Sequence, residues 1–160
     1  MPPDPTARPI TIRPENPDCP QALTCLAAYF RLLCDNIPSF TPAHFPLPDP
    51  QAETYRPPQG QFLIALCDDV PLGCVSLRAH SPGVGEVKRL WVAPAARGHG
   101  LARRLMIEIE SQARIAGLHT LKLDTNETLP AAIALYHATG WADTAPYSPF
   151  PATHWFVKRL

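Results

Sequence analysis

Short segments of alternating apolar and polar residues run through this chain, and proline, glycine or aspartate flanks most of them. Alternation over about four to eight residues is typical of a half-buried strand. The pattern predicts strands over residues 10–13, 61–67, 72–79, 86–92 and 118–124, and residues 141–145 and 154–158 are suited to finish the sheet. Only short turns separate the strands over 61–67, 72–79 and 86–92, so we expect these three to pair in antiparallel fashion.

Apolar residues spaced three or four places apart predict three helices. The first covers residues 21–34, and Pro20 suits its start. Its expected apolar face consists of Leu23, Ala27, Phe30 and Cys34. The last begins after Thr128, which can cap it, with Pro130 in the first turn and Gly140 as the stop.

The middle helix, over residues 98–116, lies between two predicted strands. The apolar face expected to pack on the sheet consists of Leu101, Leu105, Ile109, Ala113 and Ala116. Glu110 and Arg114 are four residues apart, which predicts a surface ion pair of about 0.2–0.5 kcal/mol. A strand, a helix and a strand in succession predict a parallel pair joined by a right-handed crossover, with the intervening loop at the carboxyl ends of the strands.

The strand over residues 86–92 should contain an irregularity. Val87 and Leu90 have opposite parity, yet both are suited to face the core. A single β-bulge between them would bring both side chains to the same face.

The loop before the middle helix has the features of an anion site. Gly98 and Gly100 bracket His99, and glycines at a helix start let main-chain N–H groups approach a ligand closely. The helix dipole favours a phosphate there, and Arg97 can bind two of its oxygens. The spacing matches neither a dinucleotide-binding loop nor a P-loop, and two glycines alone also fit an ordinary tight turn.

Two blocks of sequence resemble the GNAT superfamily of N-acetyltransferases. The first, Arg97-Gly98-His99-Gly100-Leu101-Ala102, matches the loop pattern (Q/R)-x-x-G-x-(G/A) and follows the strand-like E-V-K-R-L-W-V-A-P. The second, from Leu123 to Trp141, resembles the L-x-T-x-x-x-N-x-x-A-x-x-L-Y-x-x-x-G-(F/W) region, although its Asn126 falls earlier than in that pattern. The resemblance covers residues 10–160. It implies an α/β (α+β) fold with a mixed, mostly antiparallel central sheet of about six to seven strands, flanked by helices, in which a splayed parallel pair binds the cofactor.

The resemblance implies acetyl-CoA as the co-substrate. Main-chain groups of Leu90, Trp91 and Val92 are expected to bond the pantetheine arm. The groups expected to bind the pyrophosphate belong to Arg97, Gly98, His99, Gly100, Leu101 and Ala102. Asn126 could bond the pantetheine or cap the following helix, and the sequence does not favour either role.

Acetyl transfer needs a neutral amine, a polarised carbonyl and a proton for the departing thiolate. Neutralising an amine of lysine-like pKa at neutral pH costs about 4.6 kcal/mol, so a carboxylate base assists. By resemblance Glu86 is that base and Tyr136 is the general acid, while a main-chain N–H near residues 90–92 stabilises the oxyanion. Each has a structural alternative: Glu86 as the partner of Lys88, and Tyr136 as a hydroxyl at the polar edge of a helix. Transfer through an acyl-Cys74 is disfavoured because no His/Asp arrangement surrounds that thiol.

Composition limits the remaining classes of function. The 160 residues suit one domain, assigned to residues 10–160 after a flexible tail over residues 1–9. Acidic and basic residues balance, so the chain lacks the excess of positive charge that is typical of nucleic-acid binding. No apolar run reaches the roughly 18 residues that span a membrane. Five cysteines without C-x-x-C spacing favour a reducing, cytoplasmic location, and His99, His137 and His154 lack the spacing of metal ligands. A homodimer is left open.

The acceptor is the least determined feature. A primary amine of a small molecule or amino acid is favoured over a protein amine, because the neutral surface does not attract polybasic partners. A non-catalytic acyl-CoA-binding or regulatory module would share the same loop and strand. The chain has 14 of its 21 prolines within the first 60 residues. The segment over residues 37–58 fits a linker and an acceptor pocket equally well, the pocket being lined by Phe40, His44, Phe45, Tyr55 and Arg56.

Overall fold

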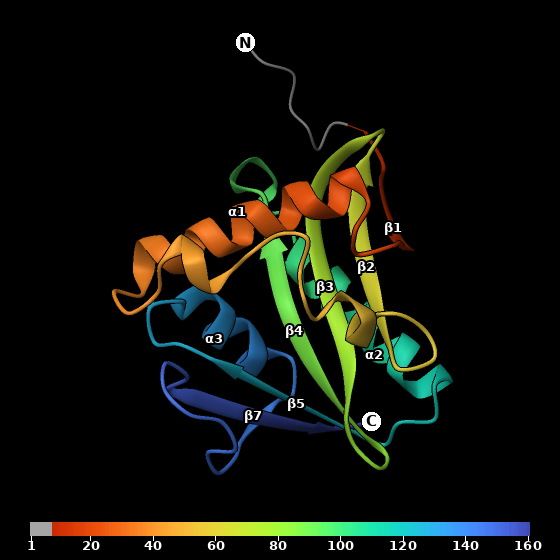
Figure 1. Ribbon diagram of the computed structural model, residues 1–160. Coiled ribbons are helices and arrows are strands. Elements are labelled where there is room, and N and C mark those ends of the chain that lie inside the picture. Colours follow the sequence, from red (N-terminus) through yellow and green to blue (C-terminus); the bar gives the residue numbers. More distant parts are fainter. Residues whose placement is uncertain (1–7) are drawn as a thin grey trace.

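A computed structural model describes residues 8–160, in which a seven-stranded sheet carries helices on both faces (Figure 1). The expected tail over residues 1–9 therefore lies mostly outside the described residues. In chain order the elements are β1 (Ile10–Pro14), α1 (Pro20–Asn36), η1 (Pro42–His44), η2 (Ala52–Tyr55), β2 (Gly60–Cys67), β3 (Val70–Ser81), β4 (Val84–Val92), η3 (Pro94–Ala96), α2 (Leu101–Ile115), β5 (Thr120–Thr125), α3 (Pro130–Ala138), β6 (Ala142–Asp143) and β7 (His154–Arg159).

Within residues 8–160 the strands follow the order β1-β2-β3-β4-β5-β7-β6, and only β4 and β5 pair in parallel. This confirms the mixed, mostly antiparallel sheet and the parallel pair around the middle helix. The parallel pairing is short, because its register covers only Val84 to Glu86 against Thr120 to Lys122. Beyond these residues β4 and β5 diverge, as Figure 1 shows, and we call the space between them the gap.

Each face of the sheet has its own apolar core. On one face, which we call the α1 face, Cys25, Leu26 and Phe30 of α1 pack on even-numbered residues of β2 such as Phe62 and Ile64. On the opposite face, α2 and α3 pack against strand residues such as Leu63, Val75 and Leu121. Each fully buried aliphatic side chain contributes about 1.5–3 kcal/mol, so these two cores hold the diverging strands in place.

The expected irregularity in β4 is confirmed. Cys74 of β3 lies opposite Trp91 and Ser76 lies opposite Lys88, so one residue of β3 faces two of β4 between those pairs. Arg89 sits in this bulge with a φ of 59°, in the left-handed region. As a result Val87 and Leu90 both pack against the α2-side core.

Several local predictions were wrong. The buried face of α1 consists of Ala22, Cys25, Leu26, Phe30 and Leu33, whereas the predicted member Ala27 is exposed. Apolar residues surround most of this helix, so its periodicity did not single out one face. Helix α2 begins at Leu101 rather than Gly98, and Ala116 beyond its end is exposed. The strand expected over residues 141–145 is reduced to β6.

Two predicted polar contacts were also wrong. Glu110 is buried and pairs with Lys158 of β7 at 2.6 Å, instead of pairing with Arg114 on the surface. The cause is the tertiary packing of α2 beside β7, which helical spacing cannot reveal. Thr128 does not cap α3, because Leu129 occupies the N-cap position and the Thr128 hydroxyl is buried without a hydrogen-bond partner among the described residues.

Candidate functional site

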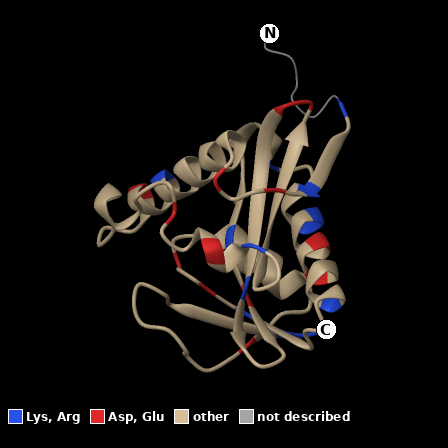
Figure 2. Ribbon diagram, turned by 45° about the vertical axis from the view of Figure 1, so that its right-hand side comes forward, with Lys and Arg blue, Asp and Glu red and all other residues tan. Residues whose placement is uncertain are grey.

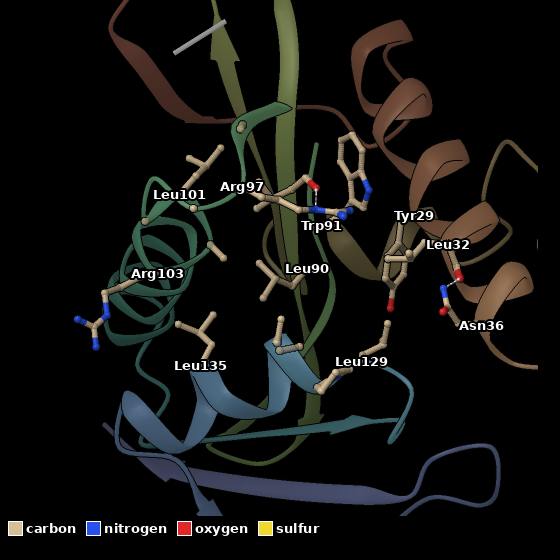
Figure 3. Close-up of a pocket in the computed structure, with 18 of the residues that line it drawn as sticks. Tyr29, Leu32, Asn36, Leu90, Trp91, Arg97, Leu101, Arg103, Leu129 and Leu135 are labelled. Carbon is tan, nitrogen blue, oxygen red and sulfur yellow. Dashed lines mark hydrogen bonds between the residues drawn. The ribbon is translucent and has the colours of Figure 1, made fainter. Parts of the chain in front are cut away.

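A cavity of about 650 Å³ opens at the carboxyl ends of β4 and β5 (Figure 3). Its walls come from the end of β4, the loop before α2, the first turns of α2 and α3, and the side of α1 that carries Tyr29, Leu32 and Asn36. Predicted cofactor residues in this lining are Leu90, Trp91, Val92, Arg97, Gly98, Gly100, Leu101 and Ala102. The structure thus brings most of the predicted binding set to one place.

The glycine loop presents bare main chain to the cavity. Gly98 and Gly100 have φ values of 81° and 76°, which glycine adopts without strain. A Cβ atom built on either residue would meet no atom within 4 Å, so both face open space. The first intrahelical bond of α2 runs from the Arg104 N–H to the Gly100 carbonyl, so the preceding N–H groups point out of the helix end. This arrangement suits an anion.

Arg97 lies at the rim of the same loop. Its Nε donates a hydrogen bond to the Val92 carbonyl at 3.1 Å, which fixes the side chain against the end of β4. The side chain is exposed and contributes to the cavity lining. The guanidinium therefore remains available to an anion bound at the start of α2.

His99 and Asn126 are placed differently from the other predicted binding residues. His99 is exposed and is not part of the cavity lining. The Asn126 side chain is buried, its Nδ2 donates to the Pro151 carbonyl at 2.6 Å, and its Oδ1 accepts from the Thr128 N–H at 2.9 Å. The amide thus connects the segment before α3 to the loop between β6 and β7.

Two tyrosines are candidates for proton transfer, but Tyr29 lines the cavity whereas Tyr136 lies behind the lining, next to the lining residue Leu135 in α3. Tyr29 lies on α1, and Figure 3 shows its hydroxyl pointing toward Leu129 at the start of α3. Tyr136 is buried in α3 against Trp141 and Phe156. Burial raises the pKa of Tyr136, and the nearby Tyr29 and Asp124 raise it further. Both hydroxyls therefore stay protonated at neutral pH and can donate hydrogen bonds.

Glu86 lies in a buried polar cluster on the α1 face. It is 3% exposed; its Oε1 accepts from Arg78 Nε at 2.8 Å and its Oε2 accepts from the Tyr147 hydroxyl at 2.8 Å. Lys88 is farther away, with its Nζ 3.9 Å from Oε2. Arg78 rather than Lys88 is thus the principal partner of Glu86, and both carboxylate oxygens are already hydrogen-bonded.

The proline-rich segment packs on α1. Phe45 stacks on Phe30 with ring centroids 4.6 Å apart, and Phe40 meets Phe45 edge-on. Tyr55 is buried beneath the Arg89 guanidinium, which also pairs with Asp49 at 2.6 Å. The segment is therefore a packed cover on the α1 face, and Arg56 is held by Asp18 and Glu53 at the surface.

The thiol of Cys74 is enclosed in the core. It is fully buried and donates to the Arg89 carbonyl in the bulge at 3.3 Å. The adjacent Cys25 thiol and burial hold the pKa of Cys74 well above its ordinary value. A protonated, enclosed thiol is a poor nucleophile.

Sequence reasoning missed Tyr29 in the cavity lining, and Tyr147 and Asp124 in the polar cluster on the α1 face. Tyr29 gave no signal, because an aromatic residue in an apolar helix is ordinarily part of a core. Tyr147 lies in a long loop whose position depends on the whole fold. Asp124 did carry a signal, since it is a charged residue at the carboxyl end of a strand beside the glycine loop.

Residues 8–160 contain neither a membrane-spanning helix nor a cluster of metal-binding side chains. None of the helices there is long and apolar enough to cross a membrane. Nor do the described His, Cys, Asp and Glu side chains form a group of three or more placed to hold a metal ion.

Comparison with known proteins relates this geometry to a family. Residues 27–141 match the model of the acetyltransferase (GNAT) family. The chain is 40% identical over 99 residues to an IAA acetyltransferase of Azospirillum brasilense, covering 61% of this chain and 65% of the relative. It is 39% identical over 108 residues to an uncharacterised N-acetyltransferase of Schizosaccharomyces pombe, covering 66% of each. The matched segment thus spans just under two thirds of these relatives.

The fold is also found among solved structures. The PaiA N-acetyltransferase of Thermoplasma acidophilum, solved in complex with coenzyme A, superposes with a TM-score of 0.71 at 14% identity. The superposition covers 95% of this chain and 99% of that one. At this identity the similarity concerns the fold alone.

Proposed function

Because the chain belongs to the acetyltransferase (GNAT) family, we propose that it moves the acetyl group of acetyl-CoA to a primary amine, by direct transfer within a ternary complex. The observation that carries the proposal is the cavity that joins the glycine loop of α2 to the end of β4 and to Tyr29. An acyl donor needs an anion site for its phosphates and space for its arm. The glycine loop suits the phosphates, and the cavity extends from it to the end of β4, where the arm would lie.

The residues fit acetyl-CoA as a co-substrate. The open space in front of Gly98 and Gly100 is where a Cβ atom would obstruct a pyrophosphate, and Arg97 supplies the adjacent positive charge. Beyond Glu86, β4 has no strand partner on its β5 side, so its main-chain groups there can bond the pantetheine amides. His99 belongs to the binding set only through its main chain, and Asn126 supports it by fixing the segment before α3.

The transfer conserves atoms and protons as follows. The acceptor ammonium loses one proton, its nitrogen attacks the thioester carbonyl, and the C–N bond forms. A main-chain N–H in residues 90–92 stabilises the oxyanion, which typically contributes about 3–4 kcal/mol. As the C–S bond breaks, Tyr136 is proposed to donate the proton that yields the free thiol, and the second proton lost by the nitrogen restores the Tyr136 hydroxyl through solvent. One proton is released in the whole reaction.

Two carboxylates on the α1 face can assist the acceptor amine: Glu86, at the last residue of β4 that pairs with β5, and Asp124, at the gap. A direct base role for Glu86 requires opening its bonds to Arg78 and Tyr147. The enclosed Cys74 supports direct transfer over an acyl-enzyme route. The described cysteines are all free thiols, which supports the proposal that the protein acts in a reducing compartment such as the cytoplasm.

The test measures acetyl-CoA consumption, detected as released free thiol, with a panel of small amines, amino acids and a lysine peptide. IAA is included because it is named in the Azospirillum brasilense relative. Amine-dependent thiol release with formation of the N-acetyl product is the expected result. A regulatory module would bind acetyl-CoA in a calorimeter yet release no thiol with any acceptor. Absence of acetyl-CoA binding would reject both readings.

A further inference from the structure

An ion pair bridges the point where β4 and β5 diverge. The parallel register ends at Glu86 opposite Lys122, and two residues farther along it would place Lys88 opposite Asp124. Here the side chains meet instead of the main chains, with Lys88 Nζ 3.2 Å from Asp124 Oδ1. Strand alternation puts both on the α1 face, so the pair closes the gap on the side opposite α2.

Asp124 is oriented by groups other than Lys88. Its Oδ2 accepts a hydrogen bond from Ser148 Oγ at 2.6 Å, and Ser148 Oγ in turn accepts from Trp155 Nε1 at 2.9 Å. Trp155 lies opposite Asp124 in the β5–β7 register. One carboxylate oxygen is therefore fixed by the protein, while the other faces a single ammonium group.

Lys88 can leave this carboxylate without losing its charge partner. Glu86 Oε2 lies 3.9 Å from Lys88 Nζ. Ser76 lies opposite Lys88 in the β3–β4 register, and its buried hydroxyl has no hydrogen-bond partner among the described residues. The side chains of Lys88 and Asp124 are 22% and 18% exposed, so the pair can be reached from outside.

Asp124 is one residue before the end of β5, and the segment that follows contributes Thr128 and Leu129 to the cavity lining. Burial raises the pKa of Tyr29 and of Tyr136, and the charge of Asp124 adds to the rise in both cases. Its carboxylate is thus within electrostatic reach of the proposed acid and of the hydroxyl that lines the cavity. Glu86, by comparison, lies two residues before Lys88, where β4 and β5 are still paired.

We propose that Asp124 is the binding site for the ammonium group of the acceptor, and that Lys88 Nζ holds this position until a primary alkylammonium displaces it. The proposal rests on the proposed function for the identity of the ligand as an acceptor. Asp124 binds and positions the nitrogen at the gap, and the ammonium proton leaves to water. A carboxylate whose second oxygen is fixed by Ser148 gives the incoming N–H groups a directed, charge-assisted partner.

The binding test uses n-butylammonium and the indole N–H signal of Trp155 in the NMR spectrum of the protein loaded with coenzyme A. The chain has three tryptophans, so Trp155→Phe identifies the signal. We expect a saturable shift in the parent protein at pH 7, and at least about tenfold weaker binding in Asp124→Asn. The uncharged 1-butanol serves as the matched ligand control and should leave the signal in place.

Lys88→Met is expected to change the amine KM in the opposite direction from Asp124→Asn. This difference distinguishes an ammonium-binding site from a structural ion pair. If Asp124 serves only to hold Lys88, both variants lose the same contact and impair the amine KM alike. If Asp124 binds the acceptor, Lys88→Met removes its competitor, so the KM for n-butylamine falls several-fold while that of Asp124→Asn rises. Acetyl-CoA affinity should change little in either variant.

The outcomes also separate this inference from the proposed function. A shift of the Trp155 signal that depends on Asp124, without thiol release from any amine, would keep the ammonium site and reject acetyl transfer. Amine-dependent thiol release with equal KM values in the parent and Asp124→Asn would keep the transfer and overturn the ammonium site. Impaired amine KM in both Asp124→Asn and Lys88→Met would likewise overturn it.

Discussion

The two sides of the gap are built in different ways. On the α2 side, the site consists mainly of main chain: two glycines with positive φ, the open end of a helix and the unpaired edge of β4. On the α1 side it consists of side chains in a charged cluster, in which Arg78 holds Glu86 and Lys88 holds Asp124. In Figure 2, blue, then red, then blue segments follow one another along α2, but there the charged side chains lie mostly on its outer surface.

This difference has a chemical reason. Phosphates and amides of a constant donor can be recognised by main-chain groups, which any sequence with the right glycines provides. An acceptor is distinguished by its own functional groups, so its side of the gap must use particular side chains. We therefore expect substitutions on the α2 side to change acetyl-CoA affinity, and substitutions on the α1 side to change the acceptor KM.

The largest effect is expected at Tyr136, the proposed proton donor, which is buried in α3 and lies outside both sets of residues. Tyr136→Phe should lower kcat about 100-fold or more, because it removes a proton donor that acts only as the C–S bond breaks. Acetyl-CoA affinity measured by calorimetry should be unchanged. The raised pKa of Tyr136 keeps its hydroxyl protonated, so the parent kcat should show no alkaline decline from this group below about pH 10.

Stability is the control for this variant, because no hydrogen bond joins the Tyr136 hydroxyl to another described residue. Thermal unfolding should therefore be nearly unchanged in Tyr136→Phe. A kcat within about threefold of the parent, under conditions where chemistry limits the rate, would make Tyr136 a packing residue only.

Gly100→Val should weaken acetyl-CoA binding about 100-fold. A β-branched residue is strained at the φ of 76° found there, and its side chain would enter the space in front of the loop. Gly117→Val is the matched control, since Gly117 has a φ of 82° and open space around it but does not line the cavity. Equal calorimetric losses in the two variants would show that strain, and not the binding surface, is responsible.

Arg97→Ala should weaken acetyl-CoA binding by about 1.5–3 kcal/mol, through loss of charge-assisted bonds to a phosphate. The acceptor KM at saturating acetyl-CoA should stay the same. Raising the ionic strength should reduce the difference between parent and variant, since Arg97 is exposed. A variant that binds as tightly as the parent at low salt would place the phosphates elsewhere.

The smallest effect is expected for Glu86→Gln, about three- to tenfold in kcat/KM. If Glu86 positions Arg78 and Tyr147, the loss should be nearly independent of pH and of the amine pKa. A base role predicts instead that the loss is greatest at low pH and fades as the free amine accumulates. The pH–rate profiles of parent and variant, measured on two amines about two pKa units apart, decide between these roles.

Much of the fold could be predicted from short-range patterns. Alternation predicted the hairpin of β2 and β3, parity predicted the bulge in β4, and connection order predicted the parallel β5. All three patterns depend on residues that are close together in the chain. The buried face of α1 could not be predicted in this way, because several faces of that helix are apolar. The Lys158–Glu110 pair could not either, because its residues lie on different elements and far apart in the chain.

The sequence by itself determined the donor side of the site. Arg97, Gly98 and Gly100 lie within four consecutive residues, so their motif contains both the helix start and the proposed anion site. Only the tertiary structure decided the proposed acceptor side, where β3, β4, β5 and the loop before β7 each contribute one or two side chains. The physical reason is the range of the forces involved. Main-chain conformation is set within a few residues, whereas a buried charge is stabilised by whichever opposite charge the folded sheet places beside it.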